Sequence, residues 1–201
     1  MRAATSGPLR KYTSAPVRAR RLWILVCALA LAVGLGACGQ TSQPSSAEND
    51  GVYVDAGPIT YQLQVSRQLN QYAVEDRQYL AGLPLGQGTL TPDELWYGVF
   101  LWAKNQTDQY HATSDTFWIK DTTGVIYYPI KLDAELNGYA WTSQVLAPTA
   151  IEPEPNTTAS FGPTQGGLVL FKLPTSVYSN RPLTLHIIPP SGKPAQISLD
   201  L

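Results

Sequence analysis

The chain has 201 residues, with 14 Lys plus Arg against 15 Asp plus Glu, two Cys and two His. Six of the basic residues and none of the acidic ones precede Cys38, so residues 38–201 carry a formal charge of about −7. Nucleic-acid binding requires clustered basic side chains, and zinc or copper sites draw on Cys, His and Met. This composition therefore argues against a nucleic-acid partner and predicts no cofactor and no metal.

The amino terminus has the pattern of an export signal. Its six basic residues precede an apolar run from Leu22 to about Ala37. That run is shorter than the roughly 20 apolar residues that a membrane-spanning helix needs. Residues 1–37 are therefore predicted to be a secretory signal peptide with a helical apolar region.

The run ends in a short motif, Leu35-Gly36-Ala37-Cys38, which resembles the lipobox of bacterial lipoproteins. In that family the cysteine thiol is joined to diacylglycerol and cleavage before it leaves a lipid-anchored chain. The resemblance implies attachment at Cys38 and a place on the outer face of the cytoplasmic membrane. An ordinary cleaved signal and an uncleaved signal anchor are the alternatives.

Residues 38–50 follow as a polar segment without a large apolar side chain, "CGQTSQPSSAEND". Such a composition cannot offset the entropy of ordering the backbone. It predicts a flexible, disordered linker, and 12 residues of coil reach roughly 20 Å. Residues 51–201 are then one domain, since about 150 residues suffice for a single core.

Strand patterns dominate that domain. Apolar and polar residues alternate in 59–65, "ITYQLQV", and residues 94–105, "ELWYGVFLWAKN", are apolar on both faces. The first pattern predicts a strand with one wet face, and the second predicts a central strand covered on both sides. Between them, 73–82 has acidic residues early and Gly82 at its end, which indicates a short helix.

The later segments complete an all-β set. The stretch "FWIKDTTGVIYYPI" predicts a hairpin whose turn is Asp121 to Gly124. Three further strands are predicted in "GGLVLFKL", "PLTLHII" and "AQISLDL". We therefore expect an immunoglobulin-like antiparallel β-sandwich of about seven to nine strands with one short helical piece.

Two of these stretches, "GGLVLFKLP" and "RPLTLHI", together with the lipobox and the polar linker, carry a wider resemblance. The chain resembles the immunoglobulin-like domains of uncharacterised lipoproteins from high-GC Gram-positive bacteria. It lacks the Cys, Trp, Cys spacing of antibody domains, so the resemblance implies only the sandwich architecture and the location.

Residues with catalytic or ligand-binding chemistry are few. His111 lies near Ser114 and Asp115 in a turn-like stretch, and His186 alternates with apolar residues in a predicted strand. Triads are defined by geometry rather than by sequence proximity, so no catalytic residue is predicted. Asp133 and Glu135 are expected to be solvated, with a shared calcium site as the alternative.

Aromatic residues are the other candidates for a site. Trp96, Phe100 and Trp102 share one face of the predicted central strand, and this face could bind a ligand if nothing covers it. The alternative is that these rings fill a core. Further aromatic residues lie on or beside predicted strands: Trp118, Tyr127, Tyr128 and Trp141.

Three functions fit this pattern. The first is a non-enzymatic interaction or accessory module that binds an envelope protein through a sheet face or edge. The second is a carbohydrate or cell-wall binding module with an exposed aromatic row. The third, a hydrolase, would require a cleft that joins His111 or His186 to a nucleophile, and it is the least favoured.

Overall fold

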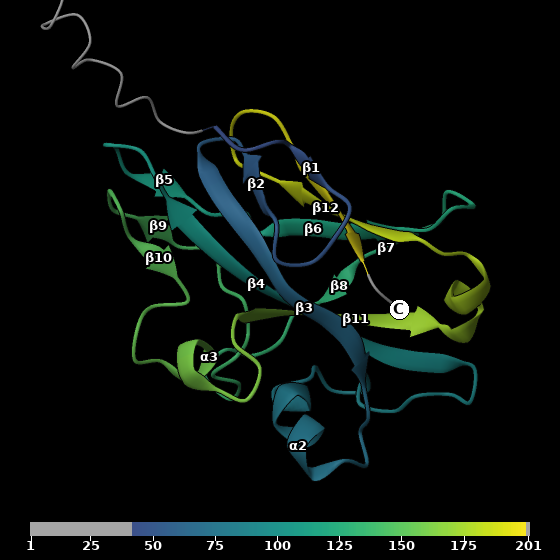
Figure 1. Cartoon of the computed structure of the whole chain (residues 1–201). Helices are drawn as coiled ribbons and strands as arrows, with labels where there is room; N and C mark the ends of the chain where they lie inside the picture. The colour runs from purple at the N-terminus through teal and green to yellow at the C-terminus, as the bar shows by residue number, and fades with distance from the viewer. Residues whose placement is uncertain (1–41, 200–201) are drawn as a thin grey trace, which may run out of the picture. The chain divides into compact units, whose positions relative to one another are not determined.

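The computed structural model describes residues 42–199, which form two packed β-sheets with short helical segments (Figure 1). The predicted signal peptide, the lipobox Leu35, Gly36 and Ala37, and Cys38 lie outside the described residues. No described helix is long and apolar enough to cross a membrane.

One sheet has five strands. Its order is β1 (Ser46–Ala47), β13 (Ala195–Leu199), β12 (Leu183–Ile188), β6 (Thr116–Lys120) and β7 (Ile126–Tyr127). The other sheet has six strands. Five follow in the order β2 (Tyr53–Ala56), β3 (Ile59–Leu69), β4 (Glu94–Asn105), β11 (Gly167–Pro174) and β8 (Pro129–Ile130), and β10 (Ile151–Glu152) also pairs with β4.

Smaller elements complete the domain. They are the two-stranded pair β5 (His111–Ala112) and β9 (Val145–Leu146), the helices α2 (Val74–Arg77) and α3 (Thr158–Phe161), and the 3-10 helices η1 (Gln78–Leu80) and η2 (Thr175–Ser179). The predicted antiparallel sandwich is confirmed. Within the described residues its strands are more numerous and shorter than expected, and one pair, β1 with β13, is parallel.

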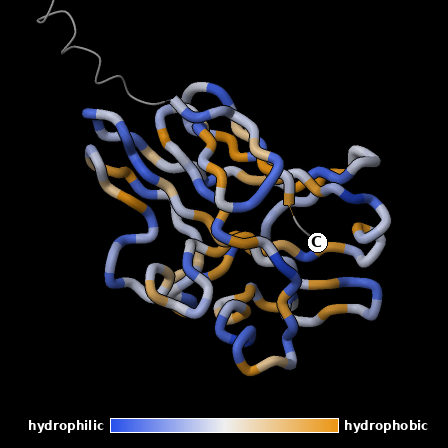
Figure 2. Tube along the Cα trace, in the orientation of Figure 1, coloured by the Kyte–Doolittle hydropathy of each residue, from blue (hydrophilic) through white to orange (hydrophobic). Residues whose placement is uncertain are grey.

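The central position of β4 follows from its sequence. It pairs antiparallel with β3 on one side and with β11 and β10 on the other. Its inner face, with Leu95, Tyr97, Val99 and Leu101, joins the core between the sheets. Figure 2 shows apolar positions recurring along the strands in the middle of the domain. The prediction that this strand is central and covered on both faces is confirmed.

The outer face of the six-stranded sheet is covered by helical and loop segments. Trp96 and Phe100 of β4 lie in a second core with Tyr79 of η1, Tyr139 and Ala159. The ring of Tyr79 meets that of Phe100 edge to face, with centroids 5.1 Å apart. This cover removes the rings of Trp96 and Phe100 from solvent.

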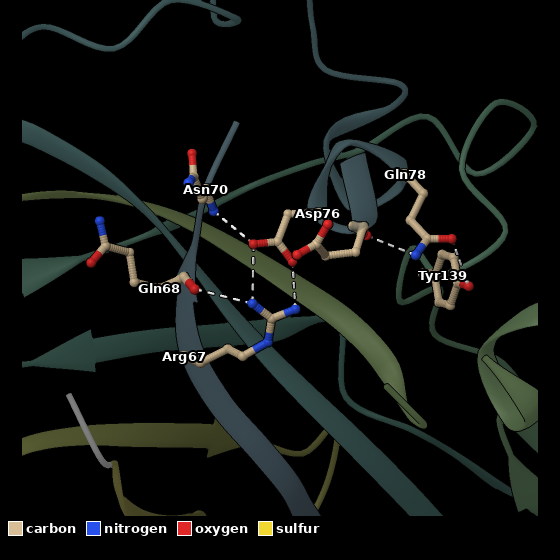
Figure 3. Close-up of polar contacts among 7 residues, drawn as sticks. Arg67, Gln68, Asn70, Asp76, Gln78 and Tyr139 are labelled. Carbon is tan, nitrogen blue, oxygen red and sulfur yellow. Dashed lines mark hydrogen bonds and ion pairs between the residues drawn. The ribbon is translucent and has the colours of Figure 1, made fainter. Parts of the chain in front are cut away.

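An ion pair holds the helical cover on the sheet (Figure 3). Arg67 of β3 donates to both carboxylate oxygens of Asp76 in α2, and the backbone N–H of Asn70 donates to Asp76 Oδ2 at 2.8 Å. Burial raises the pKa of Asp76, but the bonds from Arg67 and Asn70 outweigh it and lower the pKa below its usual value. The predicted helix over 73–82 is present as α2 followed by η1.

The predicted hairpin is also present. The strands β6 and β7 pair through Ile119 and Tyr127, and Gly124 adopts a φ of +92° in the turn between them. Asp121 Oδ1 accepts hydrogen bonds from the backbone N–H groups of Thr123 and Val125. A side chain that satisfies two turn amides explains why this polar loop closes the hairpin.

The predicted linker requires a correction. Residues 42–50 were expected to belong to a disordered segment, but Ser46 and Ala47 form β1, which pairs in parallel with Gln196 and Ile197 of β13. The backbone N–H of Gln43 also donates to Asp55 Oδ2 at 2.6 Å. Polar side chains did not prevent order here, because backbone hydrogen bonds to the edge of a sheet require no particular side chain.

Candidate functional site

Two of the three residues of the predicted aromatic face on β4 are covered by other parts of the domain. Trp96 and Phe100 are fully buried under η1 and its neighbours, so their assignment to a possible binding face is corrected. Trp102 is partly buried and borders a hollow of about 230 Å³ with Tyr53 and Ile151. The apolar outer face of β4 is covered by the layer that contains η1, because removing apolar surface from water is favourable.

A larger cleft lies at the side of the sandwich, with a volume of about 680 Å³. Its walls are β8 with the irregular segment 131–134 that follows it, and the irregular segment 140–143, while β6 and β11 contribute Phe117 and Val169. These walls meet where the edge of β11 changes partner. Leu170 and Phe171 pair with β8, whereas Leu168 pairs with the segment at Ala140.

The cleft combines apolar and polar lining residues. Ile130, Leu132, Leu168 and the two aromatic residues Phe117 and Trp141 supply apolar surface. Charged and hydroxyl groups stand among them: Asp115, Lys131, Asp133, Thr142 and Ser143. A cavity of this size with an apolar lining and a few polar groups is typical of a ligand site.

Trp141 is held in place by several contacts. Its Nε1–H donates to the backbone oxygen of Ser114 at 2.8 Å. Its ring lies edge to face with Phe117, at a centroid distance of 5.7 Å, and 6.1 Å from the ring of Tyr61. A Cβ on Gly167 would lie 2.6 Å from the indole, so only glycine leaves room for this ring. The indole is therefore a rigid wall of the cleft.

A smaller hollow of about 160 Å³ lies beside the same segment and shares Ala140, Trp141 and Thr142 with the cleft. Glu152 of β10 lines it and is 3% exposed. Oε2 of Glu152 has no hydrogen-bond partner within the described residues. A carboxyl group in such a place is held in its neutral form.

Burial is the main cause of that neutral form, and it raises the pKa of Glu152 to about 8. Hydrogen bonds from Thr113 and Gln144 oppose the rise. In the register of the inner face, Glu152 pairs with Ala103, which pairs with Tyr61. The pKa of the Tyr61 hydroxyl is also raised, chiefly by burial and in part by Glu152.

The histidines and their neighbours do not assemble a triad. Ser114 is fully buried, and its hydroxyl donates to the backbone oxygen of Ile188 at 2.6 Å. His111 lies on β5, whereas His186 lies on β12, where it stacks on Trp118 at a centroid distance of 5.4 Å. Ser114 is thus a structural hydrogen-bond donor.

The acidic pair of Asp133 and Glu135 is solvated, as expected. Asp133 and Glu135 are exposed, and Asp133 Oδ1 accepts from the backbone N–H of Glu135. Across residues 42–199, no three His, Cys, Asp or Glu side chains lie close enough together to hold a metal ion.

The sequence pointed to only part of this site. Trp141 was among the aromatic positions singled out, and Pro129 and Ile130 end the predicted hairpin, but the wall segments 131–134 and 140–143 have no strand or helix periodicity. Glu152 stands two residues from exposed Glu154, and nothing in the sequence distinguishes the two carboxylates. The burial of Glu152 depends on the pairing of β10 with β4, which no local pattern indicates.

Comparison with known proteins gives fold similarity alone. No family model and no curated protein matches the chain. Among solved structures, the YjhA protein of Bacillus subtilis is similar, with a TM-score of 0.51 and 12% identity, covering 76% of this chain and 99% of that one.

Two more distant structures also match. YcdA of Bacillus subtilis, described as a candidate lipoprotein, has a TM-score of 0.46 and 11% identity over 76% of this chain. The match covers 39% of YcdA, so this chain spans less than half of it. An uncharacterised β-sandwich protein of Clostridium difficile has a TM-score of 0.44 and 13% identity, covering 81% of this chain and 99% of that one.

Proposed function

We propose that this chain is a lipid-anchored module on the outer face of the cytoplasmic membrane that binds an envelope protein and catalyses no reaction. A diacylglyceryl group on Cys38 would attach it to the membrane. The lipobox from Leu35 to Cys38 supports the anchor, as does the resemblance to lipoproteins of high-GC Gram-positive bacteria. Two acyl chains hold a protein on a bilayer stably, whereas one does so only marginally.

The observation that carries the binding role is the cleft beside Trp141. Its volume of about 680 Å³ suits a large side chain or a short peptide segment. Neither histidine of the described residues lines the cleft. The hydroxyl of Ser114 donates its hydrogen bond to a backbone carbonyl. The lining is therefore suited to binding an apolar group with polar contacts at the rim.

Photo-cross-linking from inside the cleft tests this proposal. A benzophenone amino acid replaces exposed Thr142 in the cleft wall, and a control replaces Leu85, which is fully exposed elsewhere. In intact cells we expect one envelope protein to be cross-linked from position 142 and not from position 85. Equal adducts at both positions, or none at 142, would contradict the proposed binding role.

The anchor is tested separately with Cys38→Ala. This variant should leave the membrane fraction or retain its signal peptide. An unchanged membrane fraction at the mass of a cleaved chain would contradict lipid attachment. The two experiments fail independently of each other.

A carbohydrate-binding role is the second candidate, and the outer face of the five-stranded sheet favours it. The register aligns Trp118, His186 and Gln196 in one row across β6, β12 and β13. Tyr128, just beyond β7, is 68% exposed. Aromatic rings beside an amide are suited to stacking on sugars and bonding their hydroxyls.

Binding to purified wall glycan distinguishes the two roles. If the row binds glycan, Trp118→Ala should abolish sedimentation of the protein with wall material, and the substitution at Thr142 should not affect it. If the protein does not sediment with wall material at all, the carbohydrate role is excluded and the cleft remains the candidate.

A further inference from the structure

The first described residues are fixed to the body of the domain. Asp55 Oδ2 accepts from the backbone N–H of Gln43 at 2.6 Å, and the Asp55 N–H donates to the oxygen of Pro44 at 3.0 Å. The oxygen of Ser45 accepts from the N–H of Gln196 at 2.9 Å, immediately before the β1 pairing begins. The chain is thus held to the domain from Gln43 onward.

This docking shortens the span between the proposed lipid and the domain. Only five residue steps separate Cys38 from Gln43. A fully extended chain spans at most about 3.6 Å per residue, so these two residues can be no more than about 18 Å apart. A linker that remained free to residue 50 would allow a considerably wider separation.

Gln43 marks one particular end of the domain. It shares a shallow hollow with Gly57, His111 and Lys193. The backbone N–H of Gly57 donates to the oxygen of Lys193 at 2.8 Å, so the β2–β3 turn and the β12–β13 loop are joined at this end. Residues 190–194 of that loop are exposed and carry the cation of Lys193.

The opposite end is formed by α2. The strand β3 begins directly after the turn at Gly57 and runs to Leu69, shortly before α2 (Figure 1). Eleven residues of strand are roughly 35 Å long. Tyr72, which precedes α2, is 84% exposed. β3 therefore separates two distinguishable ends of the domain.

We infer that the end formed by the β2–β3 turn and the β12–β13 loop faces the lipid headgroups of the membrane, with the α2 end pointing away from it. This inference rests on the proposed anchor at Cys38. The short span keeps this end close to the bilayer, and Lys193 is the charged group of its exposed loop. The formal charge of about −7 on residues 38–201 disfavours a domain that lies flat on anionic headgroups.

Site-specific labelling tests the orientation. The full chain is exported and processed in a bacterium, purified and placed in vesicles whose lipids carry a nitroxide at the headgroup. Ser191→Cys and Tyr72→Cys each introduce one thiol for a fluorophore, because Cys27 lies in the predicted signal and the Cys38 thiol would be joined to lipid. Both positions are exposed.

We expect quenching at position 191 to be several-fold stronger than at position 72. Equal quenching at the two positions, or stronger quenching at 72, would overturn the inference. Flotation of the same samples separates this result from failure of the anchor: a protein that does not float with the vesicles has no lipid anchor, whereas one that floats with equal quenching is anchored in another orientation.

A longer linker tests whether the short span between Cys38 and Gln43 sets the orientation. Twenty Gly and Ser residues inserted after Gly39 add roughly 25 Å of coil without changing the docked residues. Quenching at position 191 should then fall toward the level at position 72 while flotation is unchanged. Quenching that persists after the insertion would contradict the short span as the reason for the orientation.

Discussion

Arg67 and Asp76 are joined by two hydrogen bonds, of 3.2 Å from Nη1 and 2.6 Å from Nη2, that tie α2 to β3 (Figure 3). Arg67 also lies over the ring of Tyr79, with Cζ 5.7 Å from the centroid. The pair therefore positions the segment that covers Trp96 and Phe100. The ion pair thus helps to hold the packed residues that cover the face which the sequence left as a candidate binding surface.

Asp76→Ala should destabilise the domain by about 2 kcal/mol, because it removes charge-assisted bonds at a buried group and leaves the Asn70 N–H without its acceptor. The midpoint of urea unfolding measures this effect. The neighbouring Glu75 is exposed, so Glu75→Ala is the matched control and should change stability by less than about 0.5 kcal/mol. Equal effects would show that helix composition, and not the ion pair, is responsible.

Glu152 should make the domain less stable as the pH rises. In the folded state its pKa is about 8, above its ordinary value, so the folded protein keeps a proton that the unfolded chain loses. The contribution of Glu152 to the free energy of unfolding is therefore fully present below about pH 4.5. It falls between about pH 4.5 and 8 and is constant above that.

Glu152→Gln should flatten this dependence and make the variant more stable than the wild type at pH 8, by on the order of a few kcal/mol. Urea unfolding at pH 5, 6.5 and 8 measures it. Exposed Glu154 provides the control, since Glu154→Gln should follow the wild-type curve. A wild type whose stability is constant over this range would refute the neutral carboxyl.

Asp121 should have the opposite pH dependence. Burial raises its pKa, but hydrogen bonds from Thr123, Tyr127, Val125 and Asn180 outweigh it and lower the pKa to about 2. Its contribution is present above about pH 4 and is lost as the pH falls toward 2.

Asp121→Ala should therefore lower the free energy of unfolding by about 1 kcal/mol at pH 7. The loss of stability between pH 4 and 2 should be smaller in this variant than in the wild type. Circular dichroism during acid titration follows both changes. Asp108 is exposed in another loop, so Asp108→Ala is the comparison and should leave the curve in place. A curve unchanged by Asp121→Ala would show that the hairpin closes without this side chain.

Gly167→Ala should disturb the wall of the cleft. The new Cβ would lie 2.6 Å from Cε3 of Trp141, which cannot retreat without losing its bond to Ser114. We expect a loss of about 1–3 kcal/mol and a change in Trp fluorescence. Gly88 has open space around it, so Gly88→Ala should alter neither. An unchanged spectrum for Gly167→Ala would mean that the indole is mobile rather than rigid.

Local patterns in the sequence determined much of the fold. Alternation predicted β3, apolar residues on both faces predicted a central β4, and a polar loop ending in glycine predicted the hairpin closed by Asp121 and Gly124. These features depend on neighbouring residues, since side-chain direction alternates along a strand and a turn is set by its own few residues. The export signal and lipobox, likewise read from consecutive residues, stay predictions.

Only the tertiary structure decided the rest. Whether Trp96 and Phe100 bind a ligand or fill a core depended on η1 and its neighbours folding over them, and the burial of Glu152 depended on its pairing with Ala103. Order at Ser46 comes from Gln196, 150 positions further along the chain. Backbone pairing and the covering of a sheet face join segments that are far apart in sequence, so a local pattern can indicate that a strand is covered but cannot identify the segment that covers it or pairs with it.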